Sequence, residues 1–162
     1  SDTYFQCARL LQFPELAREL GAALAGFFSD KPCDAVISPA LGGILVGHEV
    51  ARALGRRFIF CERKDGRMTI RRGFTIEKGE KLIIAEDVVT RGTSLHEVIE
   101  VVQDGGGEVV GLTGLVDRTA ADVKLPLPLR ALARVQAEAW EPADCPLCRN
   151  GAPLTKPGSR GN

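Results

Sequence analysis

The segment Leu82–Ser94 constrains the fold of this chain more than any other, and it reads Leu-Ile-Ile-Ala-Glu-Asp-Val-Val-Thr-Arg-Gly-Thr-Ser. Its continuous apolar start predicts a strand over Lys81–Glu86 that is buried on both faces, as in a mostly parallel sheet. Two adjacent carboxylates, Glu86 and Asp87, are expected at the end of this strand. A glycine turn follows, and then a helix is expected from about residue 94 to 103. A strand, a turn and a helix in this order are the repeating unit of α/β sheets.

The remaining hydrophobic pattern continues this alternation of strands and helices. It predicts strands at Asp34–Ser38, Arg57–Cys61 and Glu108–Val116, and helices at Pro14–Phe28 and Ile44–Leu54. A strand is also expected at Tyr4–Cys7, and the ambiguous segment Leu129–Ala139 favours a strand. The predicted fold class is therefore α/β, with a Rossmann-like, mostly parallel sheet flanked by helices.

Length and charge restrict the kinds of partner. A chain of 162 residues favours a single domain over residues 1–162, and its formal net charge of zero gives no overall attraction to nucleic acid or to acidic membranes. No apolar run approaches the roughly 20 residues that span a bilayer, and no signal peptide is visible. Because the chain starts within an expected strand, natural residues are expected to precede Ser1. The tail from Pro153 to Asn162 is expected to be loose.

The cysteines favour a reducing compartment. There are five, and three of them lie singly in apolar segments, as expected for buried reduced thiols in a cytoplasmic protein (Cys7, Cys33 and Cys61). Cys145 and Cys148 form a C-x-x-C pair. A structural zinc takes four ligands, so zinc here would require thiolates from two subunits; a reversible disulfide, or no bound metal, are the alternatives. His48 and His96 fall in expected helices and receive no catalytic role.

The turn after the carboxylates has the residue types that bind a phosphate group. Its glycine lets the backbone come close to a ligand, the start of the next helix presents free N–H groups, and the hydroxyls of Thr90, Thr93 and Ser94 add donors. The glycine spacing and the lack of the lysine exclude a Walker A loop. Two adjacent carboxylates can accept hydrogen bonds from the hydroxyls of a sugar. In the alternative interpretation Thr93 or Ser94 only caps the helix, and the carboxylates are a solvated strand end.

This segment resembles the signature with which type I phosphoribosyltransferases bind 5-phosphoribosyl 1-pyrophosphate (PRPP). The signature is an apolar strand, two acids, two apolar residues, and then Thr-x-Gly followed by small or hydroxyl residues. The resemblance implies the fold of that family, with a small hood built from the N-terminal segment and, as a further candidate, from the C-terminal segment. It also implies that the two acids hold the ribose hydroxyls and that the turn wraps the 5-phosphate. The PRPP-binding residues carried over are Glu86, Asp87, Val88, Val89, Thr90, Arg91, Gly92, Thr93 and Ser94.

A second glycine-containing turn is expected between the strand Asp34–Ser38 and the helix that follows it. Taken alone, Ser-Pro-Ala-Leu-Gly-Gly at residues 38–43 could be a plain connection. Beside the first motif it resembles the pyrophosphate loop of the family, in which backbone groups face an anion. That resemblance adds Ala40, Leu41, Gly42 and Gly43 to the expected PRPP site.

Residues 62–73 are rich in cations, namely Arg63, Lys64, Arg67, Arg71 and Arg72. They are either a solvated charged hairpin or a mobile lid whose cations meet the departing pyrophosphate. Arg63 and Lys64 resemble the pair that opens the catalytic loop of orotate phosphoribosyltransferases. The later lysine and histidine of that loop are absent here, and Arg67 is the candidate replacement. The resemblance thus implies Arg63, Lys64, Arg67 and Asp87 as catalytic residues, with Arg63 and Lys64 also binding PRPP.

The base site is expected around Arg118, which ends a predicted strand in the context Leu-Val-Asp-Arg. An arginine at a strand end can simply be a surface residue. In orotate phosphoribosyltransferases an arginine in this context binds the orotate carboxylate, for which a guanidinium is well suited. The resemblance adds Thr90, and also Tyr4 and Phe5, because aromatic residues of the N-terminal segment line the base pocket in the family. The family's substrate-binding lysine would lie before Ser1.

The resemblance therefore implies transfer of the phosphoribosyl group from PRPP to orotate, which gives orotidine 5′-monophosphate in pyrimidine biosynthesis. It implies Mg²⁺ as a cofactor held mainly by PRPP, and a homodimer in which the lid reaches the neighbouring subunit. One alternative is a phosphoribosyltransferase for a purine base, which would have little use for Arg118. Another is a PRPP-sensing regulator without catalysis; the cationic lid and the zero net charge favour an enzyme.

Overall fold

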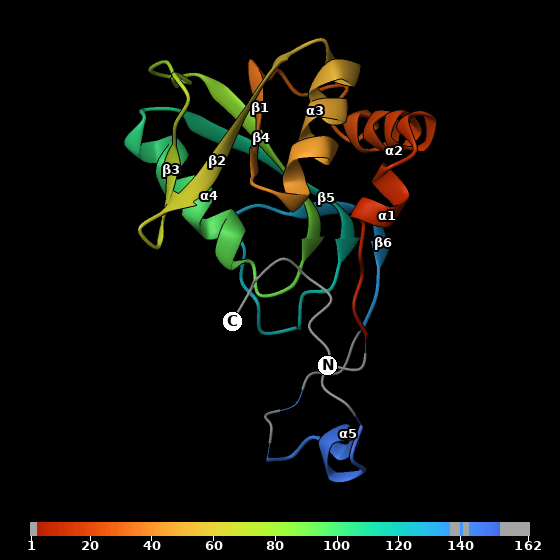
Figure 1. The fold of residues 1–162 in the computed structure, drawn as a ribbon. Coiled ribbons are helices and arrows are strands. Elements are labelled where there is room, and N and C mark those ends of the chain that lie inside the picture. Colours follow the sequence, from red (N-terminus) through yellow and green to blue (C-terminus); the bar gives the residue numbers. More distant parts are fainter. Residues whose placement is uncertain (1–2, 137–139, 141–142, 153–162) are drawn as a thin grey trace.

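A computed structural model of the chain, which describes residues 3–136, 140 and 143–152, shows one sheet with helices on both faces (Figure 1). The strands are β1 (Ala35–Pro39), β2 (Arg57–Lys64), β3 (Arg67–Ile70), β4 (Lys81–Val89), β5 (Glu108–Asp117) and β6 (Leu129–Arg134). The helices are α1 (Ala8–Leu11), α2 (Pro14–Gly26), α3 (Gly42–Leu54), α4 (Thr93–Asp104) and α5 (Pro146–Arg149). The predicted α/β class is confirmed.

The order of the strands determines where a ligand can bind. The six-stranded sheet has the order β3-β2-β1-β4-β5-β6, in which β3 is antiparallel to β2 and the other neighbours are parallel. From β1 the chain passes outward to β2, and from β4 it passes outward in the opposite direction to β5. The order therefore reverses between β1 and β4. In open α/β sheets the ligand binds at such a reversal, beyond the carboxyl ends of the strands.

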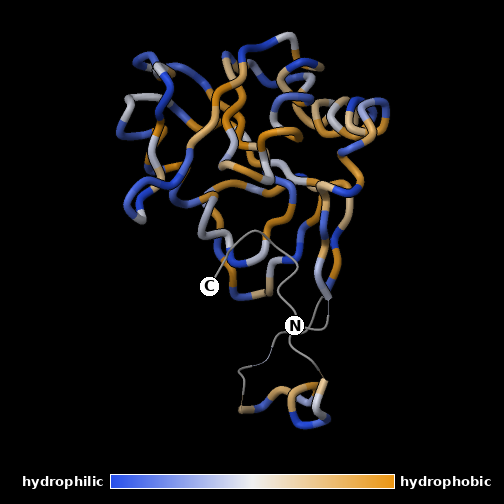
Figure 2. Tube along the Cα trace, in the orientation of Figure 1, coloured by the Kyte–Doolittle hydropathy of each residue, from blue (hydrophilic) through white to orange (hydrophobic). Residues whose placement is uncertain are grey.

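Alternate residues of the central strands point to opposite faces of the sheet, and each face packs its own helices. Val36 and Ile83 belong to the core cluster that contains buried residues of α1, α2 and α3. Ile37 and Ile84 belong to the cluster that contains the buried residues of α4. Figure 2 shows the hydrophobic segments gathered in the middle of the sheet, while the hairpin of β2 and β3 carries hydrophilic residues. Burial on both faces explains the continuous apolar centres of these strands.

The predicted strand at Tyr4–Cys7 is wrong. Residues 3–6 have no regular structure, Cys7 lies in a turn, and α1 follows directly. A strand persists only where a neighbouring strand pairs with its N–H and C=O groups. In the described part of the chain the sheet ends at β6 and does not include this segment.

At the other end of the chain, the predicted strand 129–139 is confirmed over 129–134. Residues 137–139 of that prediction, and the loose tail predicted from Pro153, lie outside the described residues. Figure 1 shows α5 set apart from the sheet. No helix in the described part of the chain has the length and apolar character needed to cross a membrane.

One ion pair joins the start of β2 to the connection that precedes β4. The Glu80 carboxylate is only 8% exposed and accepts from Nε and Nη2 of Arg57, at 2.8 and 2.6 Å. It also accepts from the backbone N–H of Glu77, at 3.0 Å. These bonds hold an edge of the sheet against the connection.

Replacing Glu80 with alanine is expected to lower the free energy of unfolding by about 2 kcal/mol. The loss stays below that of a fully buried pair because the Arg57 side chain is 40% exposed and water can solvate it. Chemical denaturation measures the change. The matched control is Glu15→Ala, which removes the exposed ion pair with Arg18 and should cost less than about 0.5 kcal/mol. Equal losses in both variants would contradict a special role for the buried carboxylate.

Candidate functional site

Strand β4 brings the two predicted carboxylates to the reversal of strand order, although not at its last residue as expected. β4 continues past Asp87 to Val89, because Val88 and Val89 keep pairing with β5. Glu86 is buried, with 7% exposure, and Asp87 is half-buried. The backbone N–H of Asp87 donates to Oε1 of Glu86 at 3.1 Å, and the N–H of Val88 donates to Oδ1 of Asp87 at 2.8 Å. These bonds hold the carboxylates at the binding end of the strand.

The glycines of the second turn lie directly against these carboxylates. A Cβ atom built on Gly42 would stand 2.6 Å from Oδ2 of Asp87. One built on Gly43 would stand 3.1 Å from Oε1 of Glu86 and 3.1 Å from the carbonyl oxygen of Ala85. Distances below about 3.4 Å leave no comfortable space for a side chain. The two motifs, far apart in the sequence, therefore form one site, and the close approach requires glycine.

Helix α3 begins two residues earlier than predicted, at Gly42. Ala40 and Leu41, which are joined by a cis peptide bond, form the turn that connects β1 to this helix. Leu41 is 73% exposed. Backbone N–H groups in the first turn of a helix have no acceptor within the helix. The first turn of α3 therefore directs its N–H groups to the same end of the sheet as the carboxylates.

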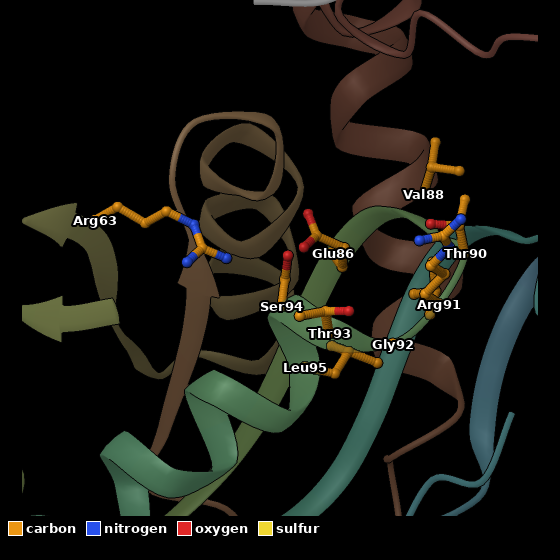
Figure 3. A pocket seen from close by; sticks show the side chains of 10 residues that line it. Arg63, Glu86, Val88, Thr90, Arg91, Gly92, Thr93, Ser94 and Leu95 are labelled. Atoms are coloured by element: carbon orange, nitrogen blue, oxygen red, sulfur yellow. The ribbon is translucent and has the colours of Figure 1, made fainter. Parts of the chain in front are cut away.

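The turn after β4 surrounds a cavity of about 200 Å³ (Figure 3). Gly92 precedes α4 with a φ of 71°, in the left-handed region that glycine adopts readily. It makes no side-chain cap, and α4 starts at Thr93, so neither Thr93 nor Ser94 is the residue that caps this helix. The lining residues are Arg63, Glu86, Val88, Val89, Thr90, Arg91, Gly92, Thr93, Ser94 and Leu95. All of them except Leu95 were predicted from the sequence, and Asp87 lies beside the cavity rather than in its lining.

Residues 62–70 lie in a hairpin of β2 and β3, and residues 71–73 follow it outside the sheet. β2 extends to Lys64 and pairs with β3, and the turn between them has positive φ values at Asp65 (52°) and Gly66 (81°). This is the backbone of a two-residue hairpin turn, for which Asp-Gly is the strongest sequence signal. A charged hairpin was one of the two interpretations of residues 62–73, and Asp65-Gly66 is the local signal that favours it.

The hairpin directs one arginine at the cavity. Arg63 forms an ion pair with Glu97 of α4 and donates to the carbonyl oxygen of Gly66 at 3.3 Å. Figure 3 shows its guanidinium extending toward the space that Glu86 and Ser94 face. A guanidinium at the mouth of a cavity can bind an anionic group.

The other hairpin cations divide into two groups. Arg71 and Arg72 form ion pairs with Glu62, at 3.5 and 3.1 Å. Lys64 and Arg67 are exposed opposite one another, next to the turn, and make no ion pair with any residue that the structure describes. Neither of them lines the cavity. Their charges are therefore available to a ligand or to another subunit.

Two of the four residues predicted for the base site, Arg118 and Phe5, lie together beside the end of β4. The backbone N–H of Arg118 donates to the carbonyl oxygen of Val89 at 2.8 Å, which fixes it beside the end of β4. Its guanidinium carbon lies 5.6 Å from the centre of the Phe5 ring, a cation–π distance. Thr90 follows Val89 directly and is exposed, and Tyr4 is 53% exposed. The irregular N-terminal segment thus covers the same end of the sheet.

The raised pKa of Cys7 agrees with an N-terminal segment that lies close to the carboxylates of β4. Burial, and next the charges of Asp87 and Glu86, raise the pKa of Cys7 to about 11. Burial raises the pKa of Cys61 to about 12. Because both thiols are neutral when folded, the protein loses stability as the pH rises from 9.0, the ordinary pKa, to about 11 and 12.

Thiol labelling at about pH 8 is expected to separate the five cysteines by burial. Cys148 is exposed and should react with a maleimide first. Cys7 and Cys61 are buried and protonated, and should react only after unfolding. Peptide mass spectrometry identifies the labelled positions, and unfolded protein is the control for full reactivity. Rapid labelling of Cys7 in the native protein would contradict the packing of the N-terminal segment.

The histidines and the C-x-x-C pair remain outside this site. His48 lies on α3 beside Phe58, and Nε2 of His96, on α4, is 3.0 Å from the carbonyl oxygen of Lys124. The backbone N–H of Cys148 lowers the pKa of Cys145, and the hydrogen bond to Cys145 raises the pKa of Cys148. Within the described ranges no three His, Cys, Asp or Glu residues gather into a metal-binding group.

Comparison with known proteins gives a consistent result. Residues 7–125 match the phosphoribosyl transferase domain family. The chain is 50% identical, over 160 residues, to a protein of Caldicellulosiruptor bescii named orotate phosphoribosyltransferase, covering 99% of this chain and 84% of that protein. A protein of the same name from Chlorobium phaeobacteroides is 48% identical over 162 residues, with 100% and 84% covered.

Solved structures agree with the fold. Orotate phosphoribosyltransferase from Aeropyrum pernix matches with a TM-score of 0.68 and 25% identity, over 83% of this chain and 80% of that one. Adenine phosphoribosyltransferase from Thermoanaerobacter pseudethanolicus matches with a TM-score of 0.71 and 18% identity, over 82% and 88%. Since these folds are so alike, the base that each enzyme uses has to be argued from the site.

Proposed function

Because the chain belongs to the phosphoribosyltransferase family and is an enzyme of that family, we propose that it transfers the 5-phosphoribosyl group from PRPP to orotate. The products are orotidine 5′-monophosphate and pyrophosphate, in the biosynthesis of pyrimidines. Support comes from the names of relatives whose sequences are 50% and 49% identical to this chain over 99% of its length. Support also comes from the observation that carries the base assignment, the stacking of Arg118 on Phe5 beside β4.

In this proposal the chain positions the reactants and stabilises charge. Glu86 and Asp87 accept hydrogen bonds from the ribose hydroxyls, and the turn Thr90–Ser94 binds the 5-phosphate. The orotate ring nitrogen attacks the anomeric carbon as the bond to pyrophosphate breaks, and its proton passes to the departing pyrophosphate. Positive charge develops on the ribose during this step. Gly42 and Gly43 hold the backbone of α3 against the carboxylates, where its N–H groups bind the pyrophosphate. Preorganised donors of this kind lower the barrier without covalent catalysis.

The cations of the hairpin act on the leaving group. Arg63 already lines the cavity, and Lys64 and Arg67 are exposed next to the hairpin turn. We assign these three residues to neutralising the pyrophosphate as it departs. Closure of the hairpin over the site would exclude the water that otherwise hydrolyses PRPP.

Recognition of the base rests on charge. Orotate carries a carboxylate, and a guanidinium can bind a carboxylate through two parallel hydrogen bonds. Arg118 supplies that group, Phe5 covers one side of it, and Tyr4 and the Thr90 hydroxyl complete the proposed pocket. Adenine and hypoxanthine are neutral and would leave the charge of Arg118 without a matching group.

Mg²⁺ fits this site as a partner of PRPP. Carboxylate oxygens such as those of Glu86 and Asp87 are ligands that Mg²⁺ accepts. No third His, Cys, Asp or Glu joins them in the described part of the chain, so the protein alone offers an incomplete set of ligands. When bound with PRPP, Mg²⁺ neutralises part of the pyrophosphate charge.

The exposed residues favour a homodimer. Leu41 and Leu45, at the start of α3, are 73% and 49% exposed, as apolar residues at a subunit contact would be. If two subunits associate so that the hairpin of one lies near the cavity of the other, its cations can reach that cavity. Lys64 and Arg67 would then serve the neighbouring active site.

The base is tested by incubating the protein with PRPP and Mg²⁺ and following the loss of orotate absorbance. Adenine, xanthine and hypoxanthine are run in parallel. Turnover with orotate alone is expected. Turnover with a purine base alone would retain the PRPP site and reject the base assignment. PRPP binding without any turnover would support a sensing protein.

The shared site is tested by mixing two variants that are each expected to impair the site, Asp87→Asn and Lys64→Ala, at a PRPP concentration that does not saturate Asp87→Asn. If the hairpin serves the neighbouring subunit, each mixed dimer has one intact site. Half of the dimers are mixed, so the mixture should recover about a quarter of the parental activity. No recovery, with mixed dimers demonstrated by native mass spectrometry, would place Lys64 in the site of its own subunit.

A further inference from the structure

A buried carboxylate lies beside the base site, and the mechanism above does not use it. Asp117 ends β5 and is only 8% exposed. Its Oδ1 accepts from the backbone N–H of Thr119 at 2.8 Å and from the Thr119 hydroxyl at 2.7 Å. Its Oδ2 lies 3.7 Å from Nε of Arg134 on β6. A buried charge is tolerated only with such compensation, so this network keeps the carboxylate in one position.

The hydrogen bonds between Asp117 and Thr119 also fix the backbone of Arg118, which lies between them in the sequence. Asp117 and Thr119 flank Arg118, and a side chain that accepts from the N–H two residues later forms a local turn that fixes the backbone in between. The N–H of Arg118 donates to the carbonyl oxygen of Val89 at 2.8 Å, which holds the turn against β4. The carbonyl oxygen of Asp117 accepts from the N–H of Val135 at 2.9 Å, which holds it against the chain just after β6.

The direction of the Arg118 side chain depends on this backbone. Its guanidinium lies 5.6 Å from the centre of the Phe5 ring, at the place proposed for the base. A long side chain has many rotamers, and the one that reaches Phe5 is useful only if the Cα–Cβ bond starts in the right direction. A small misplacement of a binding group is enough to weaken the recognition of a rigid planar ligand.

We propose that Asp117 is a positioning residue for base specificity, which holds Arg118 toward the carboxylate of the base through its hydrogen bonds to Thr119. This inference rests on the proposed function, because it assumes that Arg118 binds an anionic base. In this proposal Asp117 and Thr119 help to select the base, although neither residue contacts the substrate.

The test compares Michaelis constants for the two substrates. Asp117→Ala should raise the KM for orotate about tenfold and change the KM for PRPP less than twofold, since the PRPP site lies on other elements. Asp117→Asn keeps an oxygen that accepts both bonds from Thr119, so it should stay within about threefold of the parent. Thr119→Val removes only the hydroxyl bond and should raise the orotate KM about threefold.

Combining Asp117→Ala with Arg118→Ala tests whether Asp117 affects the orotate KM through Arg118 or by disturbing the fold. If Asp117 acts through Arg118, adding Asp117→Ala to Arg118→Ala should change the orotate KM no further. Equal increases in both KM values, or a full additional loss in the double variant, would overturn the proposal. If Asp117→Ala melts too early to assay, Thr119→Val decides, and an unchanged orotate KM in that variant overturns the proposal.

The two proposals fail in different ways. A parent protein that does not turn over orotate rejects the proposed function. A parent that does so, with variants that show no selective effect on orotate, rejects only the role of Asp117.

Discussion

Replacing Asp87 with asparagine is expected to weaken PRPP binding about 100-fold. The carboxylate is proposed to accept hydrogen bonds from ribose hydroxyls, and each bond to a charged acceptor contributes roughly 1.5–3 kcal/mol. Asparagine presents one oxygen and one N–H₂ group, so an acceptor becomes a donor that opposes a hydroxyl. Removing a negative charge near the anionic PRPP should by itself strengthen binding. The loss of the hydrogen bonds to the ribose should outweigh this gain in affinity. Hydrogen bonds are directional and local, whereas water screens the exposed part of the charge.

The structure predicts that this variant folds normally. Oδ1 of Asp87 accepts from the N–H of Val88 at 2.8 Å, and the oxygen of asparagine can accept the same bond. Calorimetric titration with PRPP and Mg²⁺ measures the affinity, and a melting curve checks the fold. Asp104→Asn, at the exposed end of α4, is the matched control and should bind like the parent. Parental affinity in Asp87→Asn would remove this carboxylate from the PRPP site.

Replacing Gly42 with alanine is expected to lower kcat/KM for PRPP about 100-fold with little loss of stability. The new Cβ would lie 2.6, 2.8 and 2.9 Å from Oδ2, Cγ and Oδ1 of Asp87. At these distances the carboxylate must rotate away or the start of α3 must shift. Either movement separates the two halves of the proposed PRPP site. The side chain of Asp87 is half-buried and can move toward solvent, so the fold should survive.

Gly26→Ala is the matched control for this substitution. Gly26 is the last residue of α2, and a Cβ built there has no heavy atom within 4 Å. The variant should keep parental activity and an equal or slightly higher melting temperature, because alanine is the better helix residue. The two variants are compared by steady-state kinetics and thermal melts. Parental kcat/KM in Gly42→Ala would show that the contact with Asp87 is unimportant for catalysis.

Predictions made from local patterns were mostly confirmed. The apolar centres of β1, β4 and β5 and the helical spacing in α2 are properties of short segments, and burial on both faces of the sheet explains them. The turn Thr90–Ser94 was also recognisable as a candidate phosphate site, because its residue types lie within a few positions of one another. The positive φ of Gly92 agrees with that interpretation.

The errors occurred where pairing between segments decides the structure. Tyr4–Cys7 has the composition of a strand but is not part of the sheet, and its Phe5 packs on Arg118 instead. β4 runs three residues past Glu86 because β5 continues beside it. The end of a strand depends on its partner strand, which a local sequence pattern does not identify. The hairpin of β2 and β3 is different, since Asp65 and Gly66 signalled it locally.

Local sequence patterns were enough to predict the α/β class, the carboxylate pair and the turn that is proposed to bind a phosphate, because each depends on neighbours in the chain. Which distant groups meet depends on the packed fold. The fold places Gly42 against Asp87, Arg63 on Glu97, and Phe5 against Arg118. The reversal of strand order between β1 and β4 brings these elements together. Contacts of that kind depend on how the sheet is ordered and packed, which no short stretch of sequence specifies.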